Sequence, residues 1–169
     1  LGDVYKRQAY YDGVVEVDLS AIRPMIALPM HPSNAFTIEE LNANLEDILH
    51  ACEQDVQKLI GRKDVSLDLC SKIENGKLRV DQGVIAGCAG GLYDSIYEAA
   101  SILKGHTGGC GDYALSVYPG SQPIMMELVR TGVISDLMAS GATIRTAFCG
   151  PCFGAGDVPA NGALSIRHT

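Results

Sequence analysis

Apolar side chains recur with two different periods in the first part of the chain. In residues 13–19 apolar and acidic residues alternate, and a period of two predicts a half-buried strand. In residues 37–60 the apolar residues recur at helical spacing, which predicts a long amphipathic helix. Thr37 and Glu40 form the capping box that begins such a helix, and Gly61 supplies the residue that ends it.

Two other stretches of this part are not helical. Residues 20–34 contain three prolines, which exclude a helix or a central strand and favour an extended segment. Asn75 and Gly76 separate two alternating runs, residues 66–70 and 77–80, and Asn-Gly in that setting is the strongest short signal for a β-hairpin. Cys70, in the first of these runs, is then expected to be a structural residue in a strand.

The pattern changes in the second half of the chain. Residues 84–86 form a short apolar run without alternation, which is typical of a parallel strand that is buried on both faces. Residues 114–117 predict a second buried strand, and residues 142–148 a third strand. Helical patterns lie between them, one beginning near Leu92 and one capped by Ser121. An alternating order of strands and helices predicts a parallel sheet with right-handed crossovers, and hence the α/β fold class.

Cysteines follow the first and the last of these predicted strands. Cys88 lies in a glycine-rich bend after residues 84–86, and Cys149 and Cys152 enclose a Gly-Pro turn after residues 142–148. Ligand sites of parallel α/β sheets lie beyond the carboxyl ends of the strands, so both loops should reach the same edge. We therefore expect the three thiols to meet, with adjacent glycines that let a bulky ligand approach the backbone.

Three convergent thiols are compatible with several chemistries. Thiolates are soft donors that suit an iron–sulfur cluster, and three protein ligands on a four-iron cluster leave one iron open as a Lewis acid. The alternatives are a zinc site completed by a histidine or a fourth cysteine, a thioredoxin-type dithiol, and plain buried thiols. The dithiol is disfavoured because turn-rich residues, rather than a helix, follow Cys152. A zinc- or dithiol-bearing binding module without catalysis is the alternative function.

Composition narrows the class of protein further. The 169 residues carry a net charge of −7 with no basic run interleaved with aromatic residues, so nucleic acid is not expected as a partner. No apolar run approaches the ~20 residues of a membrane span, so a membrane is not expected either. Six cysteines at irregular spacing do not resemble a secreted disulfide scaffold and favour a cytoplasmic location.

The remaining candidate ligands have simpler interpretations. Cys52 falls on the apolar stripe of the predicted helix and is expected in the core. His106 and Cys110 could form half of a zinc site, but no second half matches them, and a flexible glycine-rich loop is the preferred interpretation.

Four landmarks in the same order resemble the third α/β domain of the aconitase superfamily. They are Glu16–Ser20, Gly87–Cys88, Val117–Ser121 and Cys149–Cys152. The resemblance implies a three-layer parallel-sheet domain in which Cys88, Cys149 and Cys152 are the metal ligands that hold a 4Fe-4S cluster. It also implies a lyase of the hydratase type, which reversibly dehydrates and hydrates a hydroxy-polycarboxylate, a small carboxylic acid substrate.

The resemblance also sets expectations about the extent of the chain. Residues 1–8 look like a non-native extension, and residues 9–169 resemble a fragment of a longer protein whose remaining domains would be its partners. The family's substrate clamp should begin just past Thr169, so no catalytic residue is expected in this fragment and turnover by it alone is not expected. Ala89 and Gly90 stand where the family usually has Thr-Asn, which points to a divergent hydratase branch.

Overall fold

The computed structural model describes residues 11–108, 111 and 113–169, which form two compact units. The units are Leu1–Ala43 and Asn44–Thr169, and the second contains the parallel sheet and both predicted cysteine loops. The expected extension, residues 1–8, and Cys110 lie outside the described residues. Within the described part, no helix combines the length and the hydropathy needed to cross a membrane.

The described part of the first unit contains a small antiparallel ladder. β1 (Met25–Ala27) pairs with β2 (Ala35–Thr37), so the proline-containing segment is extended but forms an edge strand. The strand expected at residues 13–19 is wrong, because this stretch is irregular and ends in a 3-10 helix, Leu19–Ala21. Val14, Val15 and Val17 are 64–89% exposed, so no element of the described part of the chain covers the apolar side chains of this stretch.

The amphipathic helix begins at the capping box that the sequence predicted, Thr37 and Glu40. α1 (Ile38–Ala43) begins at a complete capping box, in which the Glu40 N–H donates to Thr37 Oγ1 at 3.1 Å. In return, the Thr37 N–H donates to Glu40 Oε2 at 2.9 Å. This reciprocal pair satisfies two of the backbone donors that every helix start leaves free, so the capping-box prediction is confirmed.

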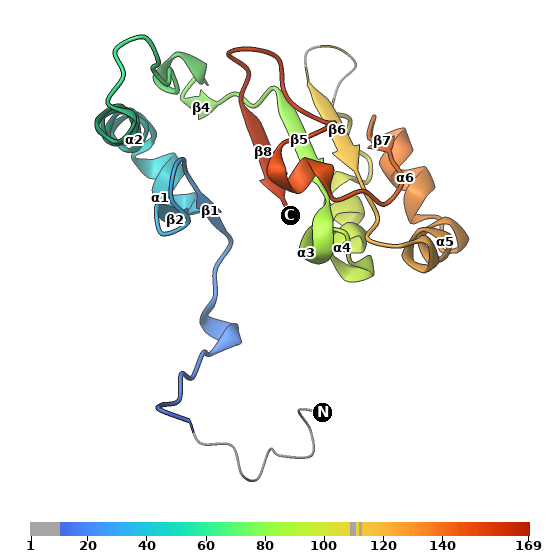
Figure 1. Ribbon diagram of the computed structural model, residues 1–169. Helices are drawn as coiled ribbons and strands as arrows, with labels where there is room; N and C mark the ends of the chain where they lie inside the picture. The colour runs from blue at the N-terminus through green and yellow to red at the C-terminus, as the bar shows by residue number, and fades with distance from the viewer. Residues whose placement is uncertain (1–10, 109–110, 112) are drawn as a thin grey trace. The chain divides into compact units, whose positions relative to one another are not determined.

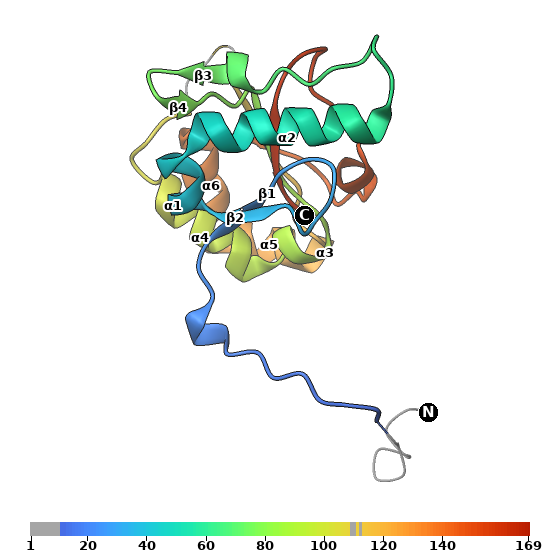
Figure 2. The ribbon, with the colours of Figure 1, turned by 90° about the vertical axis from the view of Figure 1, so that its left-hand side faces the viewer.

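The predicted helix is interrupted rather than continuous. Asn44 leaves the helical region (φ −133°, ψ 40°), and α2 (Leu45–Ile60) starts after it (Figure 2). α2 ends at Gly61, whose left-handed φ of 63° is the conformation expected of a glycine helix stop. Its buried residues keep the predicted spacing and include the cysteine: Leu45, Leu49, Cys52 and Val56.

A β-hairpin forms at the predicted turn but is shorter than expected. β3 (Ile73–Glu74) pairs with β4 (Lys77–Leu78), and both Asn75 and Gly76 have positive φ, as this turn requires. The ladder therefore consists of only the residues next to the turn.

The strand expected at residues 66–70 is wrong. Cys70 instead begins a 3-10 helix, Cys70–Lys72. The carboxylate of Glu53, on α2, accepts the N–H groups of Leu69 and Cys70, the second at 2.8 Å. These backbone donors are satisfied without a neighbouring strand, which is why the alternating pattern does not lead to a longer ladder.

A four-stranded parallel sheet organises the second unit. Its order is β7 (Thr143–Ile144), β6 (Ala114–Val117), β5 (Gln82–Ile85) and β8 (Ser165–His168) (Figure 1). Every pairing in it is parallel, so the predicted α/β fold class is confirmed. β8 was not predicted, and the last predicted strand is reduced to two residues.

Helices cover one face of this sheet. α4 (Tyr93–Leu103), α5 (Gln122–Arg130) and α6 (Val133–Ala139) surround the main core, and α5 begins at Ser121 as predicted. At the end of β5, Ile85 packs against this core, while its neighbours Val84 and Ala86 point to the opposite face. The main core consists of Ile96, Ala100, Val117, Leu128, Val133, Leu137 and Ala142.

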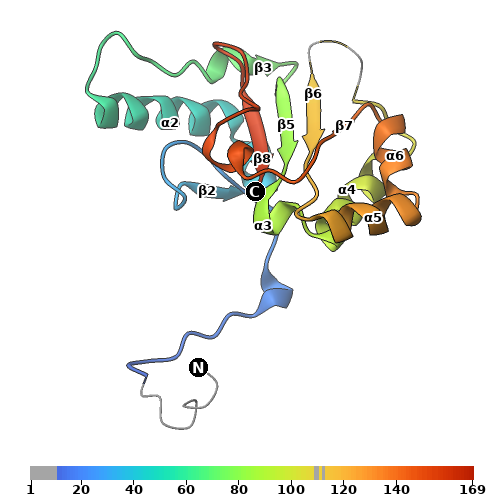
Figure 3. The same cartoon turned by 45° about the vertical axis from the view of Figure 1, so that its right-hand side comes forward.

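The opposite face of the sheet carries the second cysteine loop. Val84, Ala86 and Tyr118 form a small buried cluster there. The chain that leaves β7 passes across the sheet on this side and returns as β8 (Figure 3). The loop with two cysteines is therefore held near the end of β5, from which the first cysteine loop departs.

Candidate metal centre

The three predicted cysteines lie in two short helical turns. Cys88 is the second residue of α3 (Gly87–Gly90), which directly follows β5 and Ala86. Cys149 precedes the 3-10 helix Gly150–Phe153, and Cys152 lies within it. All three are free and exposed.

Two observations show that the two turns meet. A Cβ atom added at Gly87 would lie 2.7 Å from Sγ of Cys152, so the backbone beside Cys88 contacts a cysteine of the other loop. Although Cys152 is exposed, nearby protein atoms partly desolvate its thiol, and this desolvation, followed by the neighbouring thiols of Cys149 and Cys88, raises the pKa of Cys152. The structure thus brings together the three thiols that the sequence singled out.

The Gly-Pro turn is closed by its own backbone. The Cys152 N–H donates to the Cys149 carbonyl at 3.2 Å, and the Ala155 N–H donates to the Gly150 carbonyl at 2.8 Å. Gly154 ends the turn with φ 82°. These bonds fix the separation of the two cysteines along the turn without help from a bound ligand.

Buried and half-buried polar groups attach this turn to the sheet. Arg167, on β8, donates from Nη1 to the Pro151 carbonyl and from Nη2 to the Asp157 carbonyl at 3.0 Å. The Asp157 carboxylate accepts from Gln82 Nε2 at 2.7 Å and from the Tyr118 hydroxyl at 2.8 Å. Burial, followed by the hydrogen bond to Asp157, raises the pKa of Tyr118, which keeps its hydroxyl a donor.

The sequence analysis did not identify this support. One signal was available. Successive residues of a strand point to opposite faces, so polar Gln82 lies on the same face of β5 as Val84 and Ala86. Arg167 pairs in register with Val84, but β8 itself was not predicted. Local pattern could not show that residues 165–168 pair with β5 as an outer strand of the sheet.

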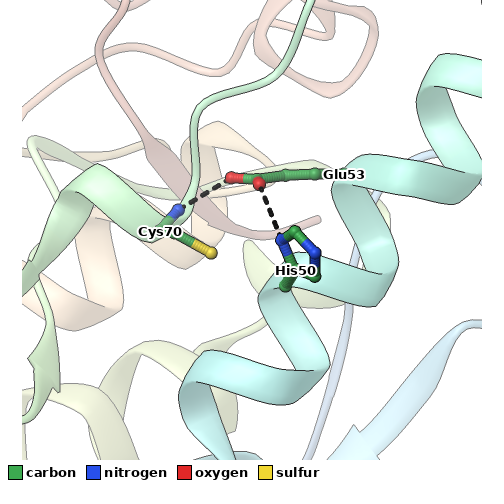
Figure 4. A group of neighbouring side chains, drawn as sticks. All are labelled: His50, Glu53 and Cys70. Atoms are coloured by element: carbon green, nitrogen blue, oxygen red, sulfur yellow. Dashed lines mark hydrogen bonds and ion pairs between the residues drawn. The ribbon is translucent and has the colours of Figure 1, made fainter.

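The other candidate ligands lie elsewhere. Cys52 is buried in the apolar side of α2, as expected. His106 lies in an exposed loop, and its proposed companion Cys110 is outside the described residues. Cys70 is not in a strand and lies beside His50 and Glu53, a group that sequence reasoning missed (Figure 4).

The arrangement fits a bulky thiolate-bound metal group. Three soft donors converge from two loops, and glycine at position 87 leaves the space beside Cys152 that a side chain would fill. Gly87 also has φ 79°, which a residue with a Cβ rarely adopts. Three thiolates are a donor set that iron–sulfur clusters use.

Comparison with known proteins identifies the family. Residues 3–169 match the family model of the Aconitase family (aconitate hydratase). The chain belongs to the aconitase family. This membership agrees with the resemblance carried by the cysteine loops and by the turn after β6.

Curated relatives match most of this chain. The 3-isopropylmalate dehydratase large subunit of Clostridium botulinum (strain Alaska E43 / Type E3) is 32% identical over 146 residues, which cover 86% of this chain and 26% of that protein. The protein of the same name from Caldanaerobacter subterraneus subsp. tengcongensis is 30% identical over 149 residues, covering 86% and 27%. The chain therefore spans about a quarter of the length of these curated relatives.

Proposed function

We propose that this chain supplies the cluster-binding part of an iron–sulfur hydro-lyase, with Cys88, Cys149 and Cys152 as the ligands of a 4Fe-4S cluster. The observation that carries the proposal is the contact between Gly87 and Cys152, which joins the two cysteine loops at the carboxyl edge of the sheet. Membership of the aconitase family supports the same assignment.

The identity of the donors supports a cluster over a single zinc ion. All three loop ligands are cysteines, and thiolates are the soft donors that hold iron–sulfur clusters. A structural zinc site would need a fourth protein ligand to complete its tetrahedron. A zinc site at these cysteines is therefore the weaker alternative.

In this proposal the chain's own residues position the ligands. When bound, a cluster held by three thiolates supplies an open iron that acts as a Lewis acid toward hydroxyl and carboxylate oxygens. Arg167 and Asp157 hold the turn that carries Cys149 and Cys152. Gly87 keeps the backbone close to Cys152, where its neighbouring N–H groups can face ligand sulfur.

The proposed substrate is a hydroxy-polycarboxylate that is reversibly dehydrated. The curated relatives are 3-isopropylmalate dehydratases by name, and Ala89 and Gly90 depart from the usual Thr-Asn of the family. Both facts favour a small branched hydroxydicarboxylate over citrate. The free cysteines among the described residues support a reducing compartment, the cytoplasm, as the location.

Anaerobic reconstitution with iron and sulfide tests the cluster. We expect about four irons and four acid-labile sulfides per chain. The variant Cys88→Ser should lose most of this content, whereas the matched control Cys70→Ser should keep it. Stoichiometric zinc without sulfide, or iron content that does not change in Cys88→Ser, would contradict the proposal.

A further inference from the structure

A second group of metal-ligating side chains lies apart from the cysteine loops. His50 and Glu53 are three residues apart on α2, and Cys70 begins the 3-10 helix that follows the loop after α2 (Figure 4). One ligand atom from each residue lies within 4.8 Å of the others. We propose that His50, Glu53 and Cys70 bind one zinc ion or a similar borderline-soft divalent cation.

The donor set is one that zinc uses. Zinc takes imidazole nitrogen, thiolate sulfur and carboxylate oxygen at about 2.0–2.3 Å, so its ligand atoms lie roughly 3.5 Å apart. The present separations are up to 4.8 Å, so the side chains must move inward by about an ångström. The imidazole of His50 is 64% exposed and can make that movement without disturbing the core.

Glu53 is already oriented for this role. Its Oε1 accepts the N–H groups of Leu69 and Cys70, which fixes the carboxylate beside the start of the 3-10 helix. Its Oε2 lies 3.9 Å from Nδ1 of His50 and faces the space between the three residues. Backbone bonds to one oxygen that aim the other at a metal are typical of second-layer support in metal sites.

The second nitrogen of His50 also has a partner. Nε2 of His50 lies 2.8 Å from Nε2 of the Gln54 amide, so in this orientation the amide nitrogen donates to the ring. Turning the amide by 180° would put Oε1 at the same place, where it would accept from Nε2–H and leave the Nδ1 lone pair free for a cation. A hydrogen bond to the nitrogen that does not bind metal is the usual way in which a protein selects the tautomer of a ligating histidine.

Carboxylates predominate around the group. Burial, and after it the charges of Glu53, Glu46 and Asp68, raises the pKa of the Cys70 thiol, and the same carboxylates attract a cation. His50 and Glu53 also line an open surface pocket through which a hydrated ion can arrive, and the lysine in its lining, Lys58, is paired with Asp55 at 2.9 Å. Three protein ligands leave one tetrahedral position for water.

A purely structural role explains only part of the group. The bonds from Leu69 and Cys70 to Glu53 would cap the 3-10 helix without any metal. That role uses Oε1 alone and requires no histidine three residues before Glu53. The Cys70 thiol donates to the Glu46 carbonyl at 3.9 Å, a weak bond that it would give up to bind a cation. With a bound ion, the same residues would tie the loop over residues 61–69 to α2.

Cobalt and zinc titrations of the whole chain test the proposal. A variant in which Cys88, Cys149 and Cys152 are all serine removes the other thiol site, and the remaining group should bind one Co²⁺ with a sulfur-to-cobalt charge-transfer band. Cys70→Ser in this background should abolish the band. His50→Ala should weaken zinc binding at least about 10- to 100-fold, the loss that changes in the second layer of ligands already produce. The exposed His106→Ala is the matched control and should leave the affinity unchanged.

A second measurement keeps the test independent of that background. In the chain with its loop cysteines intact and the cluster reconstituted, Cys70→Ser should lose one zinc equivalent and keep its iron. The proposal is overturned if no zinc binds after the loop cysteines are replaced, or if binding is the same in His50→Ala and Cys70→Ser as in their parent. These outcomes are separate from those of the cluster proposal, whose readouts are iron and sulfide.

Discussion

The substitution Gly87→Ala tests the contact on which the candidate centre depends. Gly87 has φ 79° and follows β5 by two residues. An alanine Cβ here would stand 2.7 Å from Cys152 Sγ, well inside the separation of about 3.5–4.0 Å at which nonbonded atoms attract. The methyl group must therefore displace the thiol, the backbone at residue 87, or both.

The expected cost has two parts. A left-handed backbone costs a non-glycine residue about 1–2 kcal/mol, whatever surrounds it. The collision adds to this, but Cys152 is exposed and can rotate to a different rotamer, which limits the added cost to about 1 kcal/mol. We therefore expect Gly87→Ala to lower the free energy of unfolding by about 2–3 kcal/mol, and to move Cys152 away from its partners.

Gly105→Ala provides a matched control. Gly105 has φ 78°, nearly the same as Gly87, but a Cβ there would have no heavy atom within 4 Å. Both variants thus have the same backbone strain, and only one has the collision. Their difference isolates the contact with Cys152.

The assay compares urea unfolding with iron and sulfide content after anaerobic reconstitution. Gly105→Ala should lose about 1–2 kcal/mol of stability and retain its iron. Gly87→Ala should lose more stability and also most of its iron, because the displaced thiol no longer faces the other two. If the two variants have the same iron content, the contact between the loops does not position the ligands, and our reasoning is wrong.

Three further substitutions test the support of the site. Arg167→Met removes the guanidinium hydrogen bonds to the loop carbonyls and should lower the free energy of unfolding in urea by about 2–3 kcal/mol. Arg130→Met, at an exposed side chain, is the control and should lower it by less than about 0.5 kcal/mol. Tyr118→Phe removes the donor to the Asp157 carboxylate and should cost about 1–2 kcal/mol in the same assay. Hydrogen bonds from the Leu164 N–H and from Lys72 lower the pKa of Asp81 from 3.8 to about 2, so its stabilisation is complete above 3.8 and is lost as the pH falls toward 2. Unfolding measured across that pH range should show a smaller acid loss in Asp81→Asn, and an unchanged loss would contradict this.

Local chemistry accounts for the parts of the fold that the sequence predicted correctly. The capping box at Thr37, the stop at Gly61 and the turn at Asn75 are each fixed by residues within a few positions of one another. The strands predicted at 84–86 and 114–117 are observed at Gln82–Ile85 and Ala114–Val117, because short apolar runs between glycines and helical patterns are typical of buried parallel strands. The convergence of the cysteine loops followed from topology, since parallel strands end at one edge.

The predictions failed where a pattern needed a partner that lay far away in sequence. Residues 13–19 alternate like a strand, but no described element pairs with them. Residues 66–69 do not extend the hairpin, because Glu53 on α2 satisfies the backbone donors of Leu69 and Cys70. In each case the alternation was real, and the tertiary environment decided whether a ladder formed.

β8 was not predicted from the sequence, yet its place in the sheet determines how the site is built. The strand pairs with β5 in the register Val84 to Arg167, which brings an arginine from the end of the chain behind the turn that carries Cys149 and Cys152. Strand pairing of this kind is long-range, and four residues of ordinary composition do not predict it. Nevertheless, it sets both the position of the turn and the side of the sheet on which the turn lies. A chain that formed β5, β6 and β7 without β8 would have all three thiols but would lose the arginine that supports the turn with two of them. We therefore conclude that the cysteines define the chemistry of the centre, and that the pairing of β8 with β5 positions it.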